Sequence, residues 1–229
     1  MSQAILTDSL RNSYEDLYTI DRLQGDYFRH FTMTFKSLHT SVVLLLILTV
    51  VTGLIYPLLV TGIAQLLFPV KAHGSLIVRD GITVGSELIG QPFTNPGYFW
   101  GRPSATQPSP YNAGASSGSN QGPFNPALLD SVRQRVQRLR AGDSTHTQLV
   151  PADLVTASAS GLDPHISVES ALFQVPRIAR ARSIAEEQLR ILVNEYIEGR
   201  QWGVLGERRV NVLLLNTALD KHYGNQGVR

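Results

Sequence analysis

Residues 42–68 read VVLLLILTVVTGLIYPLLVTGIAQLLF, and this stretch decides the fold class. It holds one glutamine, and no Asp, Glu, Lys or Arg occurs between Lys36 and Lys71. A hydrocarbon core of about 30 Å requires about 20 apolar residues at helical rise, so the segment can cross a membrane once. A cleaved signal has an apolar core of about 7–15 residues near the N-terminus and a small-residue cleavage site. This stretch is longer, begins past residue 40 and lacks such a site, so we predict a retained signal anchor.

The rest of the chain has the composition of a folded protein. Of the 229 residues, 43% are apolar and 17% are charged, and the shortage of charge is concentrated in the apolar stretch. We therefore predict a polar N-terminal extension (1–40), a transmembrane helix (41–69) and a globular domain (70–229). The composition excludes a disordered chain, and the absence of cysteine excludes a thiol nucleophile, a Cys-ligated metal and disulfides. A net charge of +2 is too small to indicate a nucleic-acid partner.

The charges that flank the apolar stretch predict its orientation. Arg22, Arg29 and Lys36 precede the stretch, whereas Lys71 and Arg79 follow it closely. This balance favours an N-terminus in the cytoplasm and a domain on the other side of the membrane. The extension itself carries aromatic residues among charges, which fits either an amphipathic helix on membrane lipid or a flexible tail.

A stripe of small residues runs along the predicted membrane helix. Thr49, Gly53, Pro57 and Thr61 recur every four residues and so share one helix face. Small residues at this spacing allow another transmembrane helix to approach closely. Gly and Pro are common in transmembrane helices in general, but a lone anchor has no use for such a stripe. We predict that this face contacts a partner helix.

The domain is predicted to be mixed α/β (α+β), with short strands and a long loop. The apolar runs 76–78 and 88–89 favour short strands or extended segments, and the β-branched run 154–156 favours a strand. Residues 92–126 are rich in Gly, Pro, Ser and Asn and show no periodicity, which predicts a loop. A loop of this length inside a domain is usually functional.

Four helices are predicted after the loop, the first three from a start signal and an apolar periodicity and the last over the apolar run 212–219. They begin at the pair Asn125-Pro126, at Ser167, at the capping box Ser183-x-x-Glu186 and at Val212. Gly142 is expected to end the first of these helices and Gly199 the third. Pro176 inside the second helix implies a kink or a break.

One short pattern matches a catalytic signature. Residues 114–118 read GASSG, a G-x-S-x-G pattern, and Ser116, Asp163 and His165 have the chain order of a serine hydrolase. A nucleophile elbow needs a buried strand before the serine and a helix after it, and Ser116 lies among small polar residues instead. We keep two alternatives open, a membrane-anchored serine hydrolase and a freestanding membrane-anchored binding module. The histidines lack the spacing of metal ligands, so no metal site is predicted.

The long loop also offers a candidate interface. Tyr98, Phe99 and Trp100 stand close to Arg102, and aromatic residues with arginine are enriched at protein interfaces. A rigid loop that packs on its own domain fits these residues equally well.

A series of ungapped segments then suggests a family. In chain order they are GLIYPL (53–58), GSLI (74–77), GSELIGQ (85–91), YFWGRPSAT (98–106), YN (111–112), GSN (118–120), NP (125–126), VP (150–151), LVTASASGLD (154–163), IS (166–167) and NVLLLNTALD (211–220). Gln174, Arg177, Ala179 and the pair Ala181-Arg182 belong to the same series. Over residues 42–222 the chain resembles the C subunit of the bacterial high-affinity potassium-transporting P-type ATPase, the Kdp complex. The extension departs from the family, which usually starts just before its membrane span.

The resemblance implies an accessory subunit in the bacterial inner membrane and not an enzyme by itself. In this family a channel-like subunit carries the potassium selectivity filter, and a P-type subunit hydrolyses ATP. The C subunit is needed for assembly and activity, and it has been described as a catalytic chaperone that raises the ATP affinity of the pump subunit. No cofactor is expected on this chain, because ATP and potassium ion act at the level of the complex.

Our predicted topology places the domain where ATP is absent, so we expect it to cap the outer mouth of the channel-like subunit. Two docking surfaces are predicted. One is the membrane helix face described above, and the other is a loop surface formed by residues 98–106 and 111–120 with residues 158–163, which packs on the partner outside the membrane. The predicted loop-surface residues are Tyr98, Phe99, Trp100, Arg102, Tyr111, Asn112, Asn120, Ser160 and Asp163. Gln174 and Arg177 are the candidate contacts if a nucleotide does bind, since arginine suits phosphate.

Overall fold

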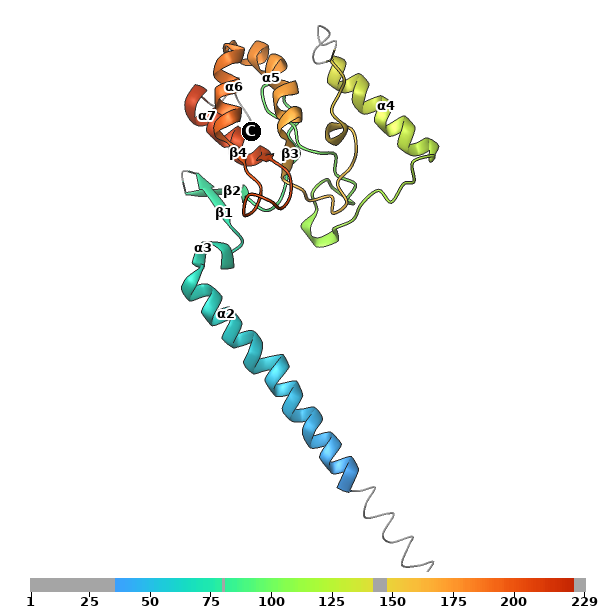
Figure 1. The fold of residues 1–229 in the computed structure, drawn as a ribbon, viewed down its shortest axis with the longest axis vertical. Coiled ribbons are helices and arrows are strands. Elements are labelled where there is room, and N and C mark those ends of the chain that lie inside the picture. Colours follow the sequence, from blue (N-terminus) through green and yellow to red (C-terminus); the bar gives the residue numbers. More distant parts are fainter. Residues whose placement is uncertain (1–35, 80, 142–147, 225–229) are drawn as a thin grey trace, which may run out of the picture. The chain divides into compact units, whose positions relative to one another are not determined.

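The structure is a computed structural model that describes residues 36–79, 81–141 and 148–224 (Figure 1). Contacts divide the chain into two compact units, Met1–Pro69 and Val70–Arg229. Most of the predicted N-terminal extension, and the Gly142 expected to end a helix, lie outside the described residues. The described part is mixed α/β with short strands, as predicted from the sequence.

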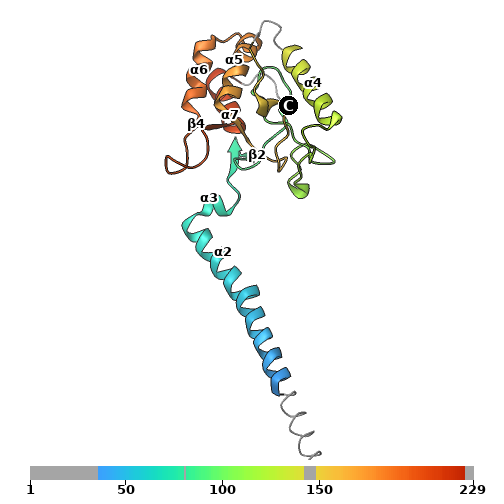
Figure 2. The same cartoon turned by 45° about the vertical axis from the view of Figure 1, so that its right-hand side comes forward.

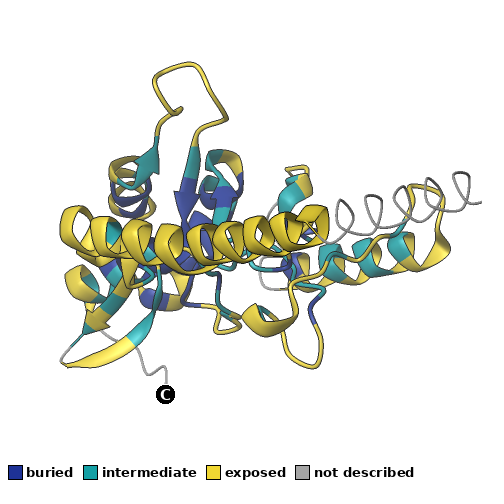
Figure 3. Ribbon diagram, turned by 90° about the horizontal axis from the view of Figure 1, so that it is seen from below, coloured by how far each residue is buried: buried dark blue, intermediate teal, exposed yellow. Residues whose placement is uncertain are grey.

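The first unit contains a helix over Lys36–Leu67 that is long and apolar enough to cross a membrane. The most apolar part of this helix is not buried in the protein. Figure 3 shows the helix as almost entirely exposed. One turn of π-helix, η1 (Val51–Ile55), precedes α2 (Tyr56–Leu67). That turn closes where the Tyr56 N–H donates to the Val51 carbonyl five residues back. Pro57 follows at once and has no N–H to donate, so a wider turn is placed where the regular ladder would fail.

The short helix α3 (Pro69–Ala72) crosses the boundary between the two units, and the second unit continues with an antiparallel hairpin of β1 (Leu76–Arg79) and β2 (Ile82–Ser86). The strand predicted over 76–78 is therefore confirmed. Residues 88–89, predicted as a short strand or an extended segment, form no strand, because they lie in a turn and a bend after β2. The turn between β1 and β2 is marked in the sequence by Asp-Gly at 80–81, a dipeptide that favours hairpin turns. Gly81 has the positive φ of 77° that a tight turn requires.

The long loop over 92–125 is confirmed, and its described regular structure is the single 3-10 turn η2 (Ala113–Ala115). The predicted helix follows as α4 (Pro126–Ala141), with the Asn125 side chain accepting from the Ala127 N–H at 2.9 Å. The strand predicted over 154–156 is wrong. Leu154 ends a 3-10 helix, η3 (Ala152–Leu154), and residues 155–156 form a turn and a bend, because Pro151 starts a tight turn and the Thr156 hydroxyl donates to the Ala152 carbonyl at 2.8 Å.

A small antiparallel sheet organises the C-terminal half. Its strands are β3 (His165–Ser167), β4 (Ile197–Glu198) and β5 (Arg209–Asn211), in the order β3-β5-β4. Val210 in the central strand pairs with Ile166 on one side and Ile197 on the other. The sheet therefore joins segments that are far apart in the sequence, which local periodicity did not predict.

Three helices complete the domain, α5 (Val168–Arg182), α6 (Glu186–Glu195) and α7 (Val212–Tyr223). The Ser167 side chain caps α5 as predicted, and the helix runs without a break through Pro176. The predicted capping box is wrong. Ser183 has a left-handed conformation that ends α5, so it cannot also cap α6, whose first flanking residue is Ala185.

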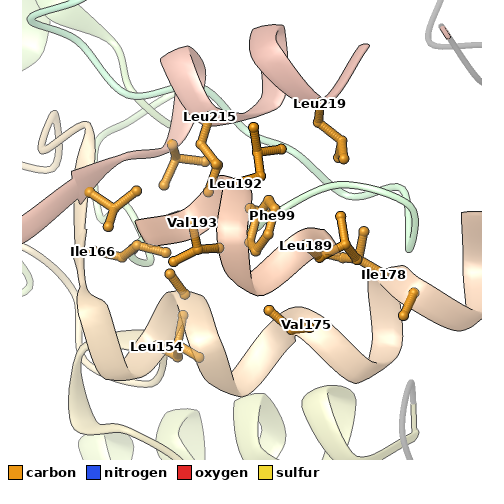
Figure 4. Close-up of a cluster of buried hydrophobic side chains, with 14 of the residues drawn as sticks. Phe99, Leu154, Ile166, Val175, Ile178, Leu189, Leu192, Val193, Leu215 and Leu219 are labelled. Carbon is orange, nitrogen blue, oxygen red and sulfur yellow. The ribbon is translucent and has the colours of Figure 1, made fainter. Parts of the chain in front are cut away.

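The hydrophobic core lies where these helices meet the sheet (Figure 2). Figure 4 shows residues of α5, α6 and α7, together with Ile166 and Leu154, around the ring of Phe99. The core therefore receives a residue from the long loop, and this insertion positions the surface described next.

Candidate docking surface

Residues 97–100, which we call the clamped segment, are held by side-chain amides from two helices. Asn216 of α7 accepts from the Phe99 N–H and donates to the Phe99 carbonyl, both at 2.9 Å. Gln174 of α5 accepts from the Trp100 N–H at 2.8 Å and donates to the Trp100 carbonyl at 3.1 Å. Each amide thus supplies the donor and acceptor that a neighbouring strand would supply, which satisfies buried backbone groups in an irregular segment.

Two buried arginines of α5 complete the clamp. Arg177 donates to the Pro96 carbonyl and, at 3.0 Å, to the Tyr98 carbonyl. Arg182 donates to the Gly97 carbonyl at 2.6 Å and pairs with Asp220 at 2.9 Å.

The arginines also stack on the aromatic rings. The guanidinium carbon of Arg177 lies 4.0 Å from the ring centroid of Trp100, and that of Arg182 lies 4.4 Å from the ring of Tyr98. Each helix cation therefore fixes one aromatic residue of the segment as well as its backbone.

These contacts place four predicted site residues inside the domain. The side chains of Tyr98 and Phe99 are buried, and so are those of Gln174 and Arg177. In this structure the four residues attach the loop to its own domain. Contact of Gln174 and Arg177 with a nucleotide stays a prediction, and it would require the bonds to the segment 96–100 to open.

The other predicted loop residues meet the turn 158–163 along a continuous seam. Arg102 pairs with Asp163 at 3.1 Å, and the Ser104 hydroxyl donates to the Gly161 carbonyl at 2.7 Å. The Ser117 N–H donates to the Ser160 carbonyl at 3.1 Å. The loop and the turn, which were predicted to act together, therefore lie side by side.

Two glycines permit this close approach. Gly161 has a φ of 68°, and a Cβ on it would lie 2.6 Å from the Thr106 methyl group. A Cβ on Gly118 would lie 2.7 Å from the Ala159 carbonyl oxygen. Any side chain at either position would push the two segments apart.

Tyr111 and Asn112 stabilise the loop at the same seam. The Tyr111 hydroxyl donates to the Arg102 carbonyl at 2.6 Å. Burial, helped by the nearby charge of Asp163, raises the pKa of Tyr111 to about 12, against the opposing effect of Arg102. The Asn112 side chain accepts from the Gly114 N–H at 3.0 Å and caps η2.

Ser116, Asp163 and His165 do not have the geometry that the serine hydrolase alternative requires. The Ser116 hydroxyl donates to the Ser160 carbonyl at 3.0 Å. The His165 ring lies between two carboxylates, with Nδ1 3.5 Å from Asp163 and Nε2 3.4 Å from Glu198. Burial would raise the pKa of Asp163, but hydrogen bonds from His165 and Arg102 outweigh it and lower that pKa. Ser116 and His165 thus bond to different groups, and the residues directly before the serine form the 3-10 turn η2 and not a strand.

The seam leaves a polar surface open to solvent. Asn120 and Ser160 are exposed, and the remaining members are half-buried. We call this set the seam surface; it consists of Arg102, Tyr111, Asn112, Asn120, Ser160 and Asp163. It is the part of the predicted loop surface that another protein can reach, while Trp100 is half-buried beside it.

The second predicted surface lies on the membrane helix. Thr49, Gly53, Pro57 and Thr61 are all exposed, and a Cβ on Gly53 would meet no atom within 4 Å. In an α-helix a four-residue repeat drifts by about 40° at each step. The π-turn at 51–55 winds less per residue and offsets part of that drift. The stripe is therefore straighter than an uninterrupted α-helix would make it.

Sequence reasoning did not single out Asn216, Arg182 and Asp220 as site residues. Asn216 had a visible signal, because it is an amide within the largely apolar run over 212–219. Arg182 and Asp220 stand among other charged residues and had no such signal. A buried polar group of this kind usually has a specific partner. Only the tertiary structure identifies that partner as the clamped segment.

Comparison with known proteins identifies the family. Residues 38–221 match the family model described as KdpC, the K+-transporting ATPase c chain. The chain belongs to this family. A Potassium-transporting ATPase KdpC subunit of Dechloromonas aromatica is 61% identical over 183 residues, covering 80% of this chain and 96% of that protein. The namesake of Methylococcus capsulatus is 61% identical over 180 residues, covering 79% and 95%.

Family membership confirms the resemblance found in the sequence. As a KdpC family member the chain is a subunit of a potassium-transporting ATPase and not an enzyme by itself. The match includes both the apolar helix and the globular unit, and it leaves most of the N-terminal extension outside.

Proposed function

We propose that the chain is an accessory subunit that docks on the channel-like subunit of the ATPase and is needed for assembly and activity. In this proposal the N-terminus is cytoplasmic, the helix crosses the bacterial inner membrane, and the domain caps the outer mouth of the channel-like subunit. The observation that carries it is the family match, which continues from the apolar helix through the whole domain.

The membrane half of the proposal uses the helix face. The face is exposed, and the small residue at its centre leaves space for a second helix backbone. Close packing of this kind is the main attraction between helices in lipid, where no hydrophobic effect acts between them. A large residue at Gly53 should therefore separate the helices.

Outside the membrane, the chain docks through the seam surface in this proposal. Its two segments are bound to each other and, through the clamped segment, to α5 and α7. A surface that is already ordered loses little conformational entropy on binding. Its exposed amide, hydroxyl and carboxylate groups suit hydrogen bonds with polar loops of a membrane protein.

The resemblance also implies a role as a catalytic chaperone. That role is compatible with this arrangement only if the domain does not contact the nucleotide directly. A domain outside the cytoplasm would raise the ATP affinity of the P-type subunit by favouring one conformation of the complex. That route needs no phosphate-binding residue on this chain.

Topology is the first test, and the cysteine-free sequence makes it simple. Gln188 is exposed on α6, and Ser9 belongs to the N-terminal extension, so Gln188→Cys and Ser9→Cys report on the two sides of the span. We expect a membrane-impermeant maleimide to label Gln188→Cys in intact cells, and Ser9→Cys only after permeabilisation. The reverse pattern would place the domain in the cytoplasm and refute the outer cap.

Assembly is the second test. Gly53→Leu should reduce co-purification with the partner subunits, whereas Gly62→Leu should not. Gly62 is a matched control because it is also exposed, is free of neighbours within 4 Å and lies off the stripe. Ser160→Trp should weaken assembly through the seam surface, with Gln188→Trp as its control. Equal co-purification of all four variants would contradict both docking surfaces.

A further inference from the structure

The connection between β4 and β5 is an ordered hairpin that projects from the globular unit. Figure 3 shows it as an exposed excursion between two strands. Gln201 and Leu205 pair across it, with N–H to carbonyl distances of 2.9 and 3.0 Å. Arg200 and Glu207 close its base with two hydrogen bonds of 2.8 and 3.0 Å. The hairpin is therefore held by both backbone and side-chain bonds.

The tip of this hairpin is apolar and faces solvent. Trp202 is 89% exposed, Val204 72% and Leu205 52%. Trp202 also has a φ of 53°, a conformation that a bulky residue adopts at a cost. A backbone that holds a large aromatic residue outward in this way indicates a binding role, because an exposed ring does not stabilise the domain by itself.

The charges around the hairpin favour a protein over a lipid surface. Arg200 is neutralised by Glu207, and Arg209 pairs with Glu198 at 2.9 Å. Arg208, which follows the base of the hairpin, has no ion pair within the described residues. Attraction to anionic lipid requires a cluster of uncompensated cations, whereas one tryptophan with one arginine is the usual composition of a protein hot spot.

We propose that residues 200–207 are a docking finger whose tip, Trp202 with Val204 and Leu205, enters an apolar pocket on another subunit of the same ATPase. A carboxylate at the rim of that pocket would face Arg208. This inference rests on the proposed function only in requiring the assembled complex. The finger tip is a third set of contact residues that belongs to neither the membrane helix face nor the seam surface, although Glu207 and Arg208 at its base line one pocket with Arg102 and Asp163.

The preformed hairpin explains how so small a tip can contribute. The bonds at its base and across its strands are made before binding, so little chain entropy is lost on docking. The chain is also anchored to the membrane that holds its partners, which raises the effective concentration of the finger at the complex. Removal of the tryptophan should therefore weaken assembly by about tenfold or more.

The test places a photoreactive residue at the tip in the complete complex. With Trp202→p-benzoylphenylalanine we expect irradiation to join this chain to another protein subunit. Ile191→p-benzoylphenylalanine is the control, because Ile191 is exposed on α6 and belongs to none of the three surfaces. Products with lipid alone, or no product beyond the Ile191 control, would overturn the proposal.

A second measurement compares the affinity of the chain for the rest of the complex. Trp202→Ala should raise the apparent Kd by about tenfold or more, and Arg208→Glu should raise it as well, whereas Ile191→Ala should not. Thermal unfolding of each variant establishes that the domain remains folded. Unchanged affinity of Trp202→Ala refutes the finger, while loss of assembly by Gly53→Leu in the same assay would show that the proposed function still holds.

Discussion

The clamped segment and the docking finger contain the same kinds of residues, and the domain uses them in opposite ways. Both are irregular segments with a tryptophan and nearby arginines. Trp100 lies under the guanidinium of Arg177, and its own N–H and carbonyl are bound by Gln174. Trp202 is exposed, and the nearby Arg200 is bound to Glu207. The comparison teaches that partners on neighbouring helices, and not composition, decide whether an aromatic loop becomes core or surface.

The strongest test of this contrast removes the ring at the centre of the core. Phe99 is fully buried, so Phe99→Ala should lower the free energy of unfolding by about 3–5 kcal/mol. Phe124 lies in the same long loop and is 92% exposed, so Phe124→Ala should change it by about 0.5 kcal/mol or less. Urea denaturation of the full chain in detergent measures both. Similar losses would mean that the segment is not a core element.

The next test removes one amide of the clamp. Gln174→Ala leaves the half-buried Trp100 N–H and carbonyl without their partners, at a total cost of about 1–3 kcal/mol. Gln188→Ala, on the exposed side of α6, is the matched control and should be nearly neutral. If Gln174→Ala proved as stable as the wild type in thermal unfolding, the clamp would not hold the segment.

A smaller effect is expected from the phenol of the clamped segment. The Tyr98 hydroxyl donates to Asp220 at 2.8 Å, so Tyr98→Phe should cost about 1–2 kcal/mol at pH 7. Burial and the Asp220 carboxylate raise the pKa of Tyr98, against an opposing effect of Arg182.

That raised pKa gives the contribution of Tyr98 a pH dependence. The stabilisation is fully present below the unfolded pKa of about 10 and is lost as pH rises through the folded value. The stability difference between wild type and Tyr98→Phe should therefore shrink from pH 9 upward, since Tyr111 titrates equally in both proteins. A difference that stays constant to pH 12 would contradict the assigned hydrogen bond.

The smallest effect on stability is expected at the finger. Trp202→Ala should leave the free energy of unfolding within about 0.5 kcal/mol of the wild type, because the exposed ring packs on nothing in its own domain. Denaturation of the free chain in detergent measures it. A loss as large as that of Phe99→Ala would show that the tip is part of the fold and remove the contrast between the two segments.

Local signals predicted the elements whose stability is largely local. The Ser167 cap starts α5 as expected, and the apolar period over 212–219 marks α7. The apolar run at 88–89 and the β-branched run at 154–156 favoured strands, but neither run pairs with a strand in the described part of the chain. Strand formation depends on such pairing and on burial more than on propensity. The capping box at 183–186 failed because the end of α5 already occupied Ser183.

Some residues of the candidate site could be predicted from the sequence, and others could not. The sequence placed Arg102 and Asp163 in two segments expected to act together, and the structure joins them by an ion pair. It could not show that Gln174 and Arg177 bind the chain's own backbone, because their partners lie more than 70 positions away.

By itself the sequence determined the membrane helix, the family and the helices with clear caps, because each depends on neighbouring residues or on long ungapped segments. Only the tertiary structure decided that Tyr98 and Phe99 are core while Trp202 is surface. The physical reason is that a backbone without a strand partner can be buried only where distant side chains satisfy its polar groups. Asn216 and Gln174 do so for the clamped segment. The finger satisfies its backbone within its own hairpin and leaves its apolar tip for a partner.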